Sequence, residues 1–448
     1  MEKLFKLKEH GTTVRTEIMA GLTTFLAMAY ILVVNPLMLS GADAGVQLMD
    51  YNAVFLATAI SSAVATLCMA FFANYPVALS AGMGLNAYFT YSVCLGMGVS
   101  WRVALTAVFV EGIIFIILSL FKFRETLVNT VPANLKYGIT AGIGLFIALV
   151  GLKGAGVVVG SDSTLVDLGK FSSPEVVLAM VGLIIIAALH HRNVKGSVLI
   201  GILVTWVLGM GAQAIGWYQG NSLLPDFSNW TLFPVVHEST ILQFDFAWVG
   251  QNLLSFAVIV FSFLFVDIFD TVGTLIGVAQ KGNLLDKDGK LPKVGGALMA
   301  DAVGTGVGSC LGTSTITSFV ESSAGVSEGG RTGLTSVTVA VLFILSIFLY
   351  PIFTAIPSFA TTPALVFVGL LMMGSIKNMT FEGDIADTVG GFLAVIMMPF
   401  TYSIANGIMF GMLSWVILKV LTGKVKDIHP VMWIAALLFV LRMVTMVL

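Results

Sequence analysis

Charged residues are scarce in this chain. Asp, Glu, Lys and Arg make up only 10% of its 448 residues, against about 25% in an ordinary soluble domain, whereas 57% are apolar or aromatic residues of the set AVILMFWYC. The 22 basic and 24 acidic residues nearly cancel, so no strongly basic composition points to nucleic acid as a partner. The composition excludes a soluble globular protein and predicts an integral membrane protein.

Motifs for enzymatic, nucleotide-driven and metal chemistry are also missing. The sequence contains no G-x-x-x-x-G-K-[ST] loop for ATP and no H-E-x-x-H metal motif. Its three cysteines, Cys68, Cys94 and Cys310, lie in apolar stretches and form no disulfide or metal-binding pattern. Residues 1–17 lack the apolar core and cleavage site of a removed signal peptide. We expect no enzymatic activity, no metal and no cofactor.

Long apolar segments fill most of the chain. With roughly 20 residues per membrane helix, 448 residues accommodate about fourteen helices and their connections. The first seven apolar segments are 16–39, 52–73, 79–97, 100–121, 136–152, 175–190 and 196–216; the second seven are 248–279, 294–310, 313–327, 332–350, 362–376, 387–400 and 402–421. A further apolar stretch, 431–448, contains Arg442, and hydropathy alone does not decide whether it crosses the membrane.

The positions of Lys and Arg predict the orientation. With a cytoplasmic N-terminus, Arg102, Lys153 and Lys170 are the basic residues of the fourteen-segment region that fall outside, and the long connection 217–248 has no Lys or Arg. Lys122, Arg124, Lys287 and Lys290 are among those that fall inside. Because cytoplasmic loops carry an excess of basic residues, we expect the N-terminus in the cytoplasm.

Two segments rich in glycine and small polar residues, 79–88 and 312–325, do not read as continuous helices. Non-helical backbone inside a membrane is tolerated only where it is buried in protein or lines a polar cavity. Each is the third segment of its half, and a repeat of seven helices must be inverted because seven is odd. Interrupted helices at matching places indicate a transport site; close helix packing through small residues is the alternative.

Ionisable side chains within apolar segments cost about 2.5 to 3.5 kcal/mol each on insertion scales and commonly mark a pathway or relay. Asp267 and Asp270 are three residues apart, which places both carboxylates on one helix face. Glu321 lies in the second interrupted segment, and Asn86 has the matching place in the first. A buried structural pair is the alternative for the two aspartates, and a structural role is equally open for two further acidic residues, Glu111 and Asp301.

At these residues the sequence resembles the nucleobase:cation symporters of the xanthine/uracil permease class, in their AzgA-like branch of hypoxanthine, guanine and adenine permeases. The motifs that carry the resemblance are GLTTFLAMAY (21–30), AGMGLNA (81–87), FVDIFDT (265–271) and VESSAG (320–325) with GGRTGL (329–334). The resemblance implies fourteen helices in two inverted repeats, divided into a core and a gate domain. The implied boundaries are core 1–124 and 248–350, gate 125–217 and 351–422, an extracytoplasmic loop 218–247 and a C-terminal segment 423–448.

The resemblance also implies roles for individual residues. Asp267 and Glu321 become the principal purine ligands, Asn86 becomes a third ligand, and Asp270 becomes a support or coupling residue. The implied lining residues are Ala27, Val320 and Ser322. No catalytic residue follows from it.

The expected function is proton-coupled import of purine nucleobases by an elevator-like mechanism. The expected location is a bacterial inner membrane, where membrane lipid surrounds the protein. A carboxylate at Asp267 accepts from N1–H of a 6-oxopurine but opposes the unprotonated N1 of adenine, which favours hypoxanthine and guanine; a protonated Asp267 reverses this preference. Sodium coupling stays open, as does a homodimer formed through the gate domain. The alternative function is an anion transporter or exchanger of the same architecture, which the acidic site disfavours.

Overall fold

The computed structural model of the chain describes residues 2–120, 131–161, 163–228, 230–282, 284 and 291–447. Among these residues, ten helices are long and apolar enough to cross a bilayer, and three further apolar helices are shorter. The predicted class, an all-α polytopic membrane protein, is therefore confirmed. Four basic residues that the orientation argument places inside lie beyond the described residues: Lys122, Arg124, Lys287 and Lys290.

The predicted apolar segments correspond to helices, except that 79–97 and 313–327 each combine a short strand with helix. The first half contains α1 (Glu2–Phe5), α2 (Val14–Met28), α3 (Ile31–Ser40), η1 (Ala42–Ala44), α4 (Tyr51–Phe72), α5 (Met83–Ala87), the π-helix η2 (Tyr88–Gly96), α6 (Trp101–Leu120), α8 (Ala133–Gly154), α9 (Pro174–His191) and α10 (Ser197–Ala214). The second contains α11 (Phe246–Gln251), α12 (Leu253–Lys281), α13 (Val294–Leu311), α14 (Ser322–Ser327), α15 (Gly333–Ser346), η3 (Ile347–Leu349), α16 (Tyr350–Thr354), α17 (Ser358–Met373), η4 (Gly374–Asn378), α18 (Ile385–Phe400), α19 (Ile404–Leu421), η5 (Val425–Asp427) and α20 (Pro430–Val447).

Local sequence signals explain where several helices begin and end. The Asp50 carboxylate accepts from the backbone N–H of Ala53 at 2.8 Å and caps α4. Pro174 occupies the first turn of α9, where its missing N–H costs nothing. Gly312 ends α13 with a φ of +105°, a conformation that residues with a Cβ rarely adopt.

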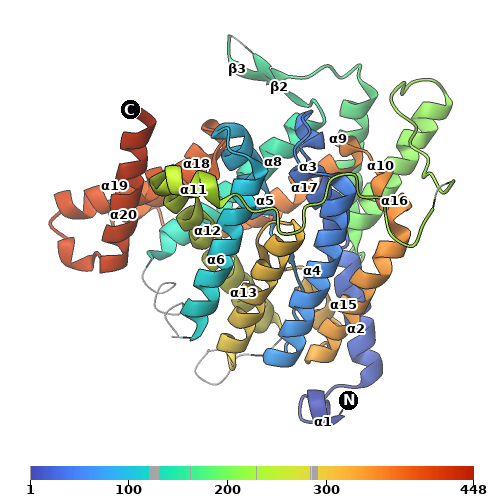
Figure 1. Cartoon of the computed structure of the whole chain (residues 1–448), viewed down its shortest axis with the longest axis horizontal. Coiled ribbons are helices and arrows are strands. Elements are labelled where there is room, and N and C mark those ends of the chain that lie inside the picture. Colours follow the sequence, from blue (N-terminus) through green and yellow to red (C-terminus); the bar gives the residue numbers. More distant parts are fainter. Residues whose placement is uncertain are drawn as a thin grey trace.

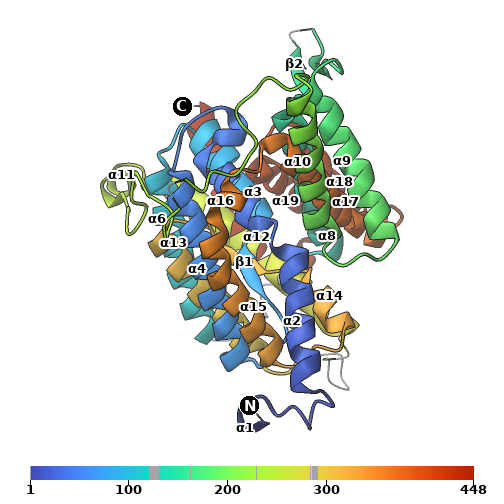
Figure 2. The same ribbon diagram turned by 90° about the vertical axis from the view of Figure 1, so that its right-hand side faces the viewer.

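The long helices form two packing groups, which Figure 2 shows from the side. In the first, called here the α4 group, α4 packs against α13 and α15, α13 packs against α6, and α2 packs against α14 and α15. In the second, called the α8 group, α8 packs against α17 and α18, and α9 packs against α10 and α17. The groups meet where α5 and α12 contact α8 and where α2 contacts α10. Each group combines helices from both halves of the chain, as Figure 1 shows by colour.

Two short strands at the centre of the α4 group replace continuous helix in the two interrupted segments. Strand β1 (Leu79–Ala81) pairs antiparallel with β4 (Ile316–Ser318), with Ser80 opposite Thr317. Helix α5 begins two residues after β1, and α14 begins four residues after β4. The predicted discontinuity of the third and tenth segments is therefore confirmed.

The outer edge of each of these strands is satisfied by a threonine from the helix that precedes it. The Thr66 hydroxyl of α4 donates to the carbonyl of Leu79 at 3.1 Å and accepts from its N–H at 3.0 Å. The Thr305 hydroxyl of α13 makes the same two bonds with Ile316, at 3.0 and 3.2 Å. Because unpaired backbone groups are costly inside a membrane, these threonines allow a two-stranded ribbon at that depth. The same solution in both halves agrees with an internal repeat.

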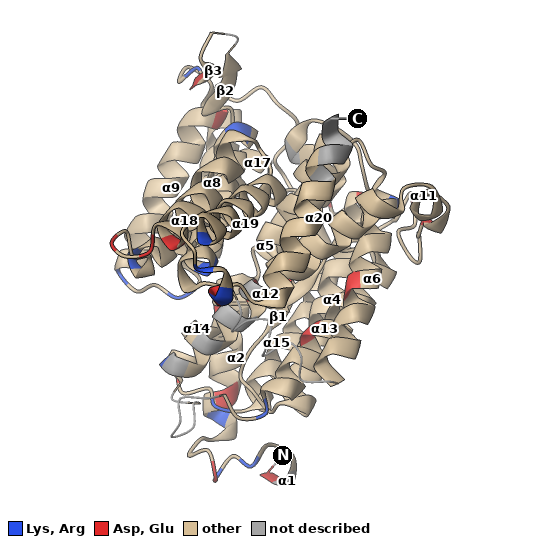
Figure 3. Cartoon of the chain, turned by 90° about the vertical axis from the view of Figure 1, so that its left-hand side faces the viewer, with Lys and Arg blue, Asp and Glu red and all other residues tan. Residues whose placement is uncertain are grey.

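Charged residues gather on connections and helix ends, while the helix surfaces in Figure 3 are almost free of them. Among the acidic residues within helices are Glu111 on α6 and Asp301 on α13, and neither is exposed. One feature was not predicted: strands β2 (Val158–Ser161) and β3 (Leu165–Leu168) form an exposed ribbon between α8 and α9. The C-terminal apolar stretch, for which the sequence left open whether it crosses the membrane, forms α20, which packs against α12 and α19.

Candidate functional site

The β1–β4 ribbon places Asn86 in a fully buried position. Asn86 is the fourth residue of α5, its backbone N–H donates to the carbonyl of Gly82 at 2.8 Å, and its side chain is 0% exposed. The hydroxyl of Ser314, from the segment that leads into β4, donates to Oδ1 of Asn86. The amide nitrogen Nδ2 has no hydrogen-bond partner among the described residues. A buried donor without a partner costs about 1 to 3 kcal/mol, so this nitrogen is ready to donate to a ligand.

Glu321 stands directly before α14, at the position where a side chain often caps a helix. Its carboxylate makes no capping bond. Instead, the hydroxyl of Tyr30, which lies between α2 and α3, donates to Oε1 of Glu321 at 2.6 Å. Tyr30 was not predicted as a functional residue. A tyrosine hydroxyl within an apolar segment needs a polar partner, and this was the available signal.

Asp270 of α12 lies against the ribbon. Its Oδ2 accepts from the hydroxyl of Thr317 in β4 at 3.3 Å, and it is 3.6 Å from the point where a Cβ on Gly82 would lie. That same Cβ would be 2.3 Å from Cγ2 of Thr317, so the close approach of the two segments requires a glycine at position 82. Asn86 follows β1, Asp270 contacts β4 and Glu321 follows β4, so all three residues lie next to the ribbon.

Asp267 lies one turn before Asp270 on α12 and is fully buried. The hydroxyl oxygen of Thr271 is 3.2 Å from Oδ1 of Asp267 and 2.9 Å from Oδ1 of Asp301. This threonine joins α12 to α13. The hydroxyl of Thr315 similarly donates to the carboxylate of Glu111 at 2.7 Å. The two acidic residues for which the sequence left a structural role open are therefore each within hydrogen-bond distance of a buried threonine hydroxyl.

The three predicted lining residues have different surroundings. The hydroxyl oxygen of Ser322 accepts from the backbone N–H of Ala78 at 3.0 Å, so it supports the ribbon. Val320 is 49% exposed, although it lies in an apolar segment. Ala27 is half-buried in the last turn of α2.

Helix α5, which follows strand β1, contacts the α8 group at Gly84. A Cβ on Gly84 would lie 2.7 Å from Cγ2 of Ile143 on α8. Asn86 is two residues further along α5. The candidate site therefore lies close to the boundary between the two packing groups.

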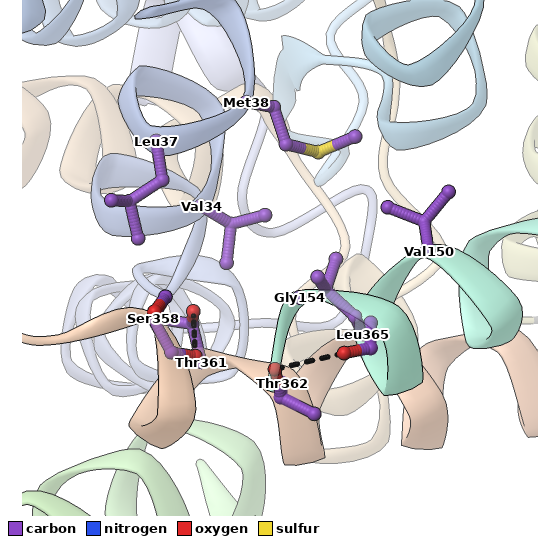
Figure 4. A pocket seen from close by; sticks show the side chains of 10 residues that line it. Val34, Leu37, Met38, Val150, Gly154, Ser358, Thr361, Thr362 and Leu365 are labelled. Atoms are coloured by element: carbon purple, nitrogen blue, oxygen red, sulfur yellow. Dashed lines mark hydrogen bonds between the residues drawn. The ribbon is translucent and has the colours of Figure 1, made fainter. Parts of the chain in front are cut away.

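A separate small cavity lies between helices α3, α8 and α17 (Figure 4). Its volume is about 10 Å³, which holds about one water molecule. The hydroxyls of Thr361 and Thr362 at its wall already donate to the carbonyls of Ser358 and Gly151. It is lined mainly by apolar side chains such as Val34 and Val150 and is too small for an organic ligand.

Comparison with known proteins gives the family. Residues 15–410 match the family Xan_ur_permease, described as a permease family. The chain is 49% identical to a putative permease, MJ0326, of Methanocaldococcus jannaschii, over 99% of this chain and 98% of that one. It is 45% identical to the guanine/hypoxanthine permease PbuO of Bacillus subtilis (98% and 99% covered) and 43% identical to the adenine permease AdeP of Escherichia coli (99% and 96% covered).

Solved structures share the fold at low sequence identity. The transmembrane domain of the cyanobacterial bicarbonate transporter BicA superposes with a TM-score of 0.65 and 14% identity, over 87% of this chain and 96% of that one. SLC26A9 superposes with a TM-score of 0.64 and 13% identity, over 91% and 66%. These likenesses concern the fold alone. The family match and the relatives named as permeases show that the chain belongs to the xanthine/uracil permease family of membrane transporters and is not an enzyme.

Proposed function

We propose that this protein imports purine nucleobases and binds them at the β1–β4 ribbon. The observation that carries the proposal is the buried amide nitrogen of Asn86, which has no hydrogen-bond partner among the described residues and lies on α5, directly after β1. Asp270 accepts from Thr317 of β4, and Glu321 follows β4 by three residues. One donor among several acceptors suits a flat, uncharged ligand with both ring N–H groups and ring acceptors. The relatives named as adenine and guanine/hypoxanthine permeases support the same class of substrate.

Hypoxanthine and guanine are the favoured substrates. A 6-oxopurine offers N–H donors to Asp267 or Glu321 and an oxygen acceptor to the Asn86 amide, whereas adenine has an unprotonated N1 that would face an ionised carboxylate. The chain is about equally identical in sequence to the relatives named as adenine permease and as guanine/hypoxanthine permease, so these relatives do not decide between the two kinds of substrate. The preference therefore rests on the charge of the carboxylates.

We further propose that a proton accompanies the nucleobase. The Thr271 hydroxyl has one hydrogen and can donate to only one of its two neighbours, Asp267 and Asp301. The second contact is a hydrogen bond when the other carboxyl group carries a proton. Asp270, partly buried beside the ribbon, is a third group suited to exchange a proton during transport.

Alternating access would come from movement between the two packing groups. In this proposal the α4 group is the core domain (1–124 and 248–350), which carries the ribbon, and the α8 group is the gate domain (125–217 and 351–422). The few contacts between them, such as Gly84 with Ile143, suit an elevator-like displacement.

The N-terminus would lie in the cytoplasm of a cell whose inner membrane holds the protein.

Orientation can be tested by labelling single cysteines. Positions in the connection 220–245 should react with a membrane-impermeant reagent from outside, and positions 291 and 292 only from inside. Reaction of both regions from the same side would contradict the proposed topology.

Function is tested by uptake of radiolabelled hypoxanthine, guanine and adenine into vesicles under imposed pH and sodium gradients, with sulfate and bicarbonate as competitors. We expect purine uptake that a protonophore abolishes. Uptake that survives the protonophore and follows the sodium gradient would identify sodium as the coupling ion in place of the proton. Transport of the anions without purine uptake would overturn the proposal.

Two variants test the ligand roles. Asp267→Asn and Glu321→Gln each leave one ligand donor unpaired, which should weaken purine binding by about five- to a hundredfold. If both proteins are folded and bind hypoxanthine and guanine with unchanged affinity, the carboxylates are structural.

A further inference from the structure

We propose that Tyr30 is a positioning residue for Glu321. Its hydroxyl occupies one carboxylate oxygen and holds the side chain in place, so that the other oxygen accepts from the nucleobase. The inference rests on the proposed function, because it assigns the group that orients one of the proposed ligands. It concerns a contact between residues 291 positions apart in the sequence.

The hydrogen bond itself has the length of a strong, charge-assisted bond. The Tyr30 oxygen lies 2.6 Å from Oε1 of Glu321, and O–H···O⁻ bonds are commonly 2.5 to 2.7 Å long. Tyr30 is 1% exposed, so water does not replace this bond at low cost. A carboxylate has about four acceptor positions on its two oxygens, so the bond from Tyr30 to Oε1 leaves acceptor capacity on Glu321.

The Glu321 side chain makes no capping bond to α14, although Glu321 directly precedes that helix. Its backbone there is already helical, with φ −58° and ψ −21°, whereas capping side chains belong to residues with extended backbone. The Tyr30 hydroxyl is the side-chain donor that the structure shows on this carboxylate.

The backbone around the pair is held by close helix packing. A Cβ on Gly325 of α14 would lie 2.2 Å from Oγ1 of Thr24 and 2.4 Å from the carbonyl oxygen of Ala20, both on α2. This contact brings α14 directly against α2. Since Tyr30 follows α2 by two residues and Glu321 precedes α14 by one, the same packing sets their separation.

Charged groups near the pair do not substitute for the tyrosine. The guanidinium of Arg331 donates to the backbone carbonyls of Val326 and Gly330, at 2.6 and 2.7 Å. Asp270, a carboxylate on α12, has no hydrogen to donate when ionised and instead accepts from the Thr317 hydroxyl at 3.3 Å.

Tyr30→Phe tests the proposal, because it removes the hydroxyl and keeps the ring. Equilibrium binding of hypoxanthine to the purified full-length protein should weaken about 10- to 100-fold. Adenine binding should weaken less, because a carboxyl group without its donor is protonated more readily and can then donate to N1. Tyr51→Phe is the matched control: its hydroxyl donates to the carbonyl of Phe353 at 3.4 Å, and purine binding should not change.

A double variant separates positioning from a general structural effect. If Tyr30 acts through Glu321, Tyr30→Phe combined with Glu321→Gln should bind hypoxanthine no more weakly than Glu321→Gln alone. Losses that multiply in the double variant would overturn the inference, and so would unchanged binding by Tyr30→Phe when Glu321→Gln binds weakly. Unchanged binding by Glu321→Gln would instead contradict the proposed ligand role of Glu321.

Discussion

Lys195 and Glu328 form an ion pair that joins the two packing groups. Lys195 lies in the connection between α9 and α10 of the α8 group, and Glu328 follows α14 of the α4 group. Their side chains are 49% and 34% exposed. Displacement of one group along the other would have to break this pair, so the pair favours the arrangement seen here.

Reversing the charge of one partner of this pair should alter the uptake rate, and reversing the charge of the other partner as well should restore it. Exposed ion pairs contribute about 0.2 to 1 kcal/mol and like-charge pairs oppose by similar amounts, so Lys195→Glu alone should change the uptake rate by no more than about thirtyfold. The double variant Lys195→Glu with Glu328→Lys should return to the original rate. If the double variant shows only the summed effects of the two single ones, the pair has no role in the equilibrium between arrangements.

Gly84→Ala should slow transport because it places a methyl group at the boundary between the groups. The new Cβ would lie 2.7 Å from Cγ2 of Ile143, which must then move. Ile143→Ala in the same chain should restore uptake by removing the obstructing side chain. Gly211→Ala on α10, where a Cβ meets nothing within 4 Å, is the control and should transport normally.

Asn86→Asp should reduce purine affinity about five- to a hundredfold. The substitution keeps the size of the side chain and the acceptor for the Ser314 hydroxyl, but it replaces an amide donor that has no partner in the described part of the chain with a second acceptor. Isothermal titration calorimetry or radioligand binding to the purified protein measures the change in purine affinity. Asn52→Asp, at an amide that donates to the carbonyl of Val235, should bind normally, and equal losses in both variants would argue against a specific role for Asn86.

Asp384→Asn should destabilise the protein near neutral pH. Asp384 caps α18, and its Oδ2 accepts from Lys419 at 2.6 Å and from Lys424 at 2.9 Å. These hydrogen bonds hold the pKa of Asp384 well below its usual range. Losing them should lower the free energy of unfolding by about 1 to 3 kcal/mol, measured as a lower thermal unfolding temperature in detergent.

The pH dependence of that difference follows from the lowered pKa. The stabilisation is fully present above the pKa of an unfolded aspartate, about 3.9, and it is lost as the pH falls toward the folded-state value. The two unfolding temperatures should therefore differ at pH 7 and converge below about pH 4. Asp427→Asn, whose carboxylate is 59% exposed, should have little effect, and a difference for Asp384→Asn that grows at acidic pH would contradict the assignment.

Hydropathy and local spacing were enough to predict the membrane class, the fourteen apolar segments and the two interruptions. These properties depend on neighbours in the chain: apolar length determines what can span a bilayer, and the small polar and glycine residues of 79–88 lower the local preference for helix. The three-residue spacing of Asp267 and Asp270 likewise predicts a shared helix face without reference to the rest of the chain.

Partners distant in sequence were decided only by the tertiary structure. The bonds of Tyr30 to Glu321 and of Ser314 to Asn86 span 291 and 228 residues, and no local pattern specifies them. They depend on the antiparallel register of β1 with β4 and on the contact of α14 with α2. The sequence by itself therefore determined which polar residues enter the membrane, because burial cost is a property of each residue in its segment. Only the tertiary structure decided which polar groups meet and which donor is left without a partner, because hydrogen bonds require positions within about 3 Å that the packing of distant helices sets.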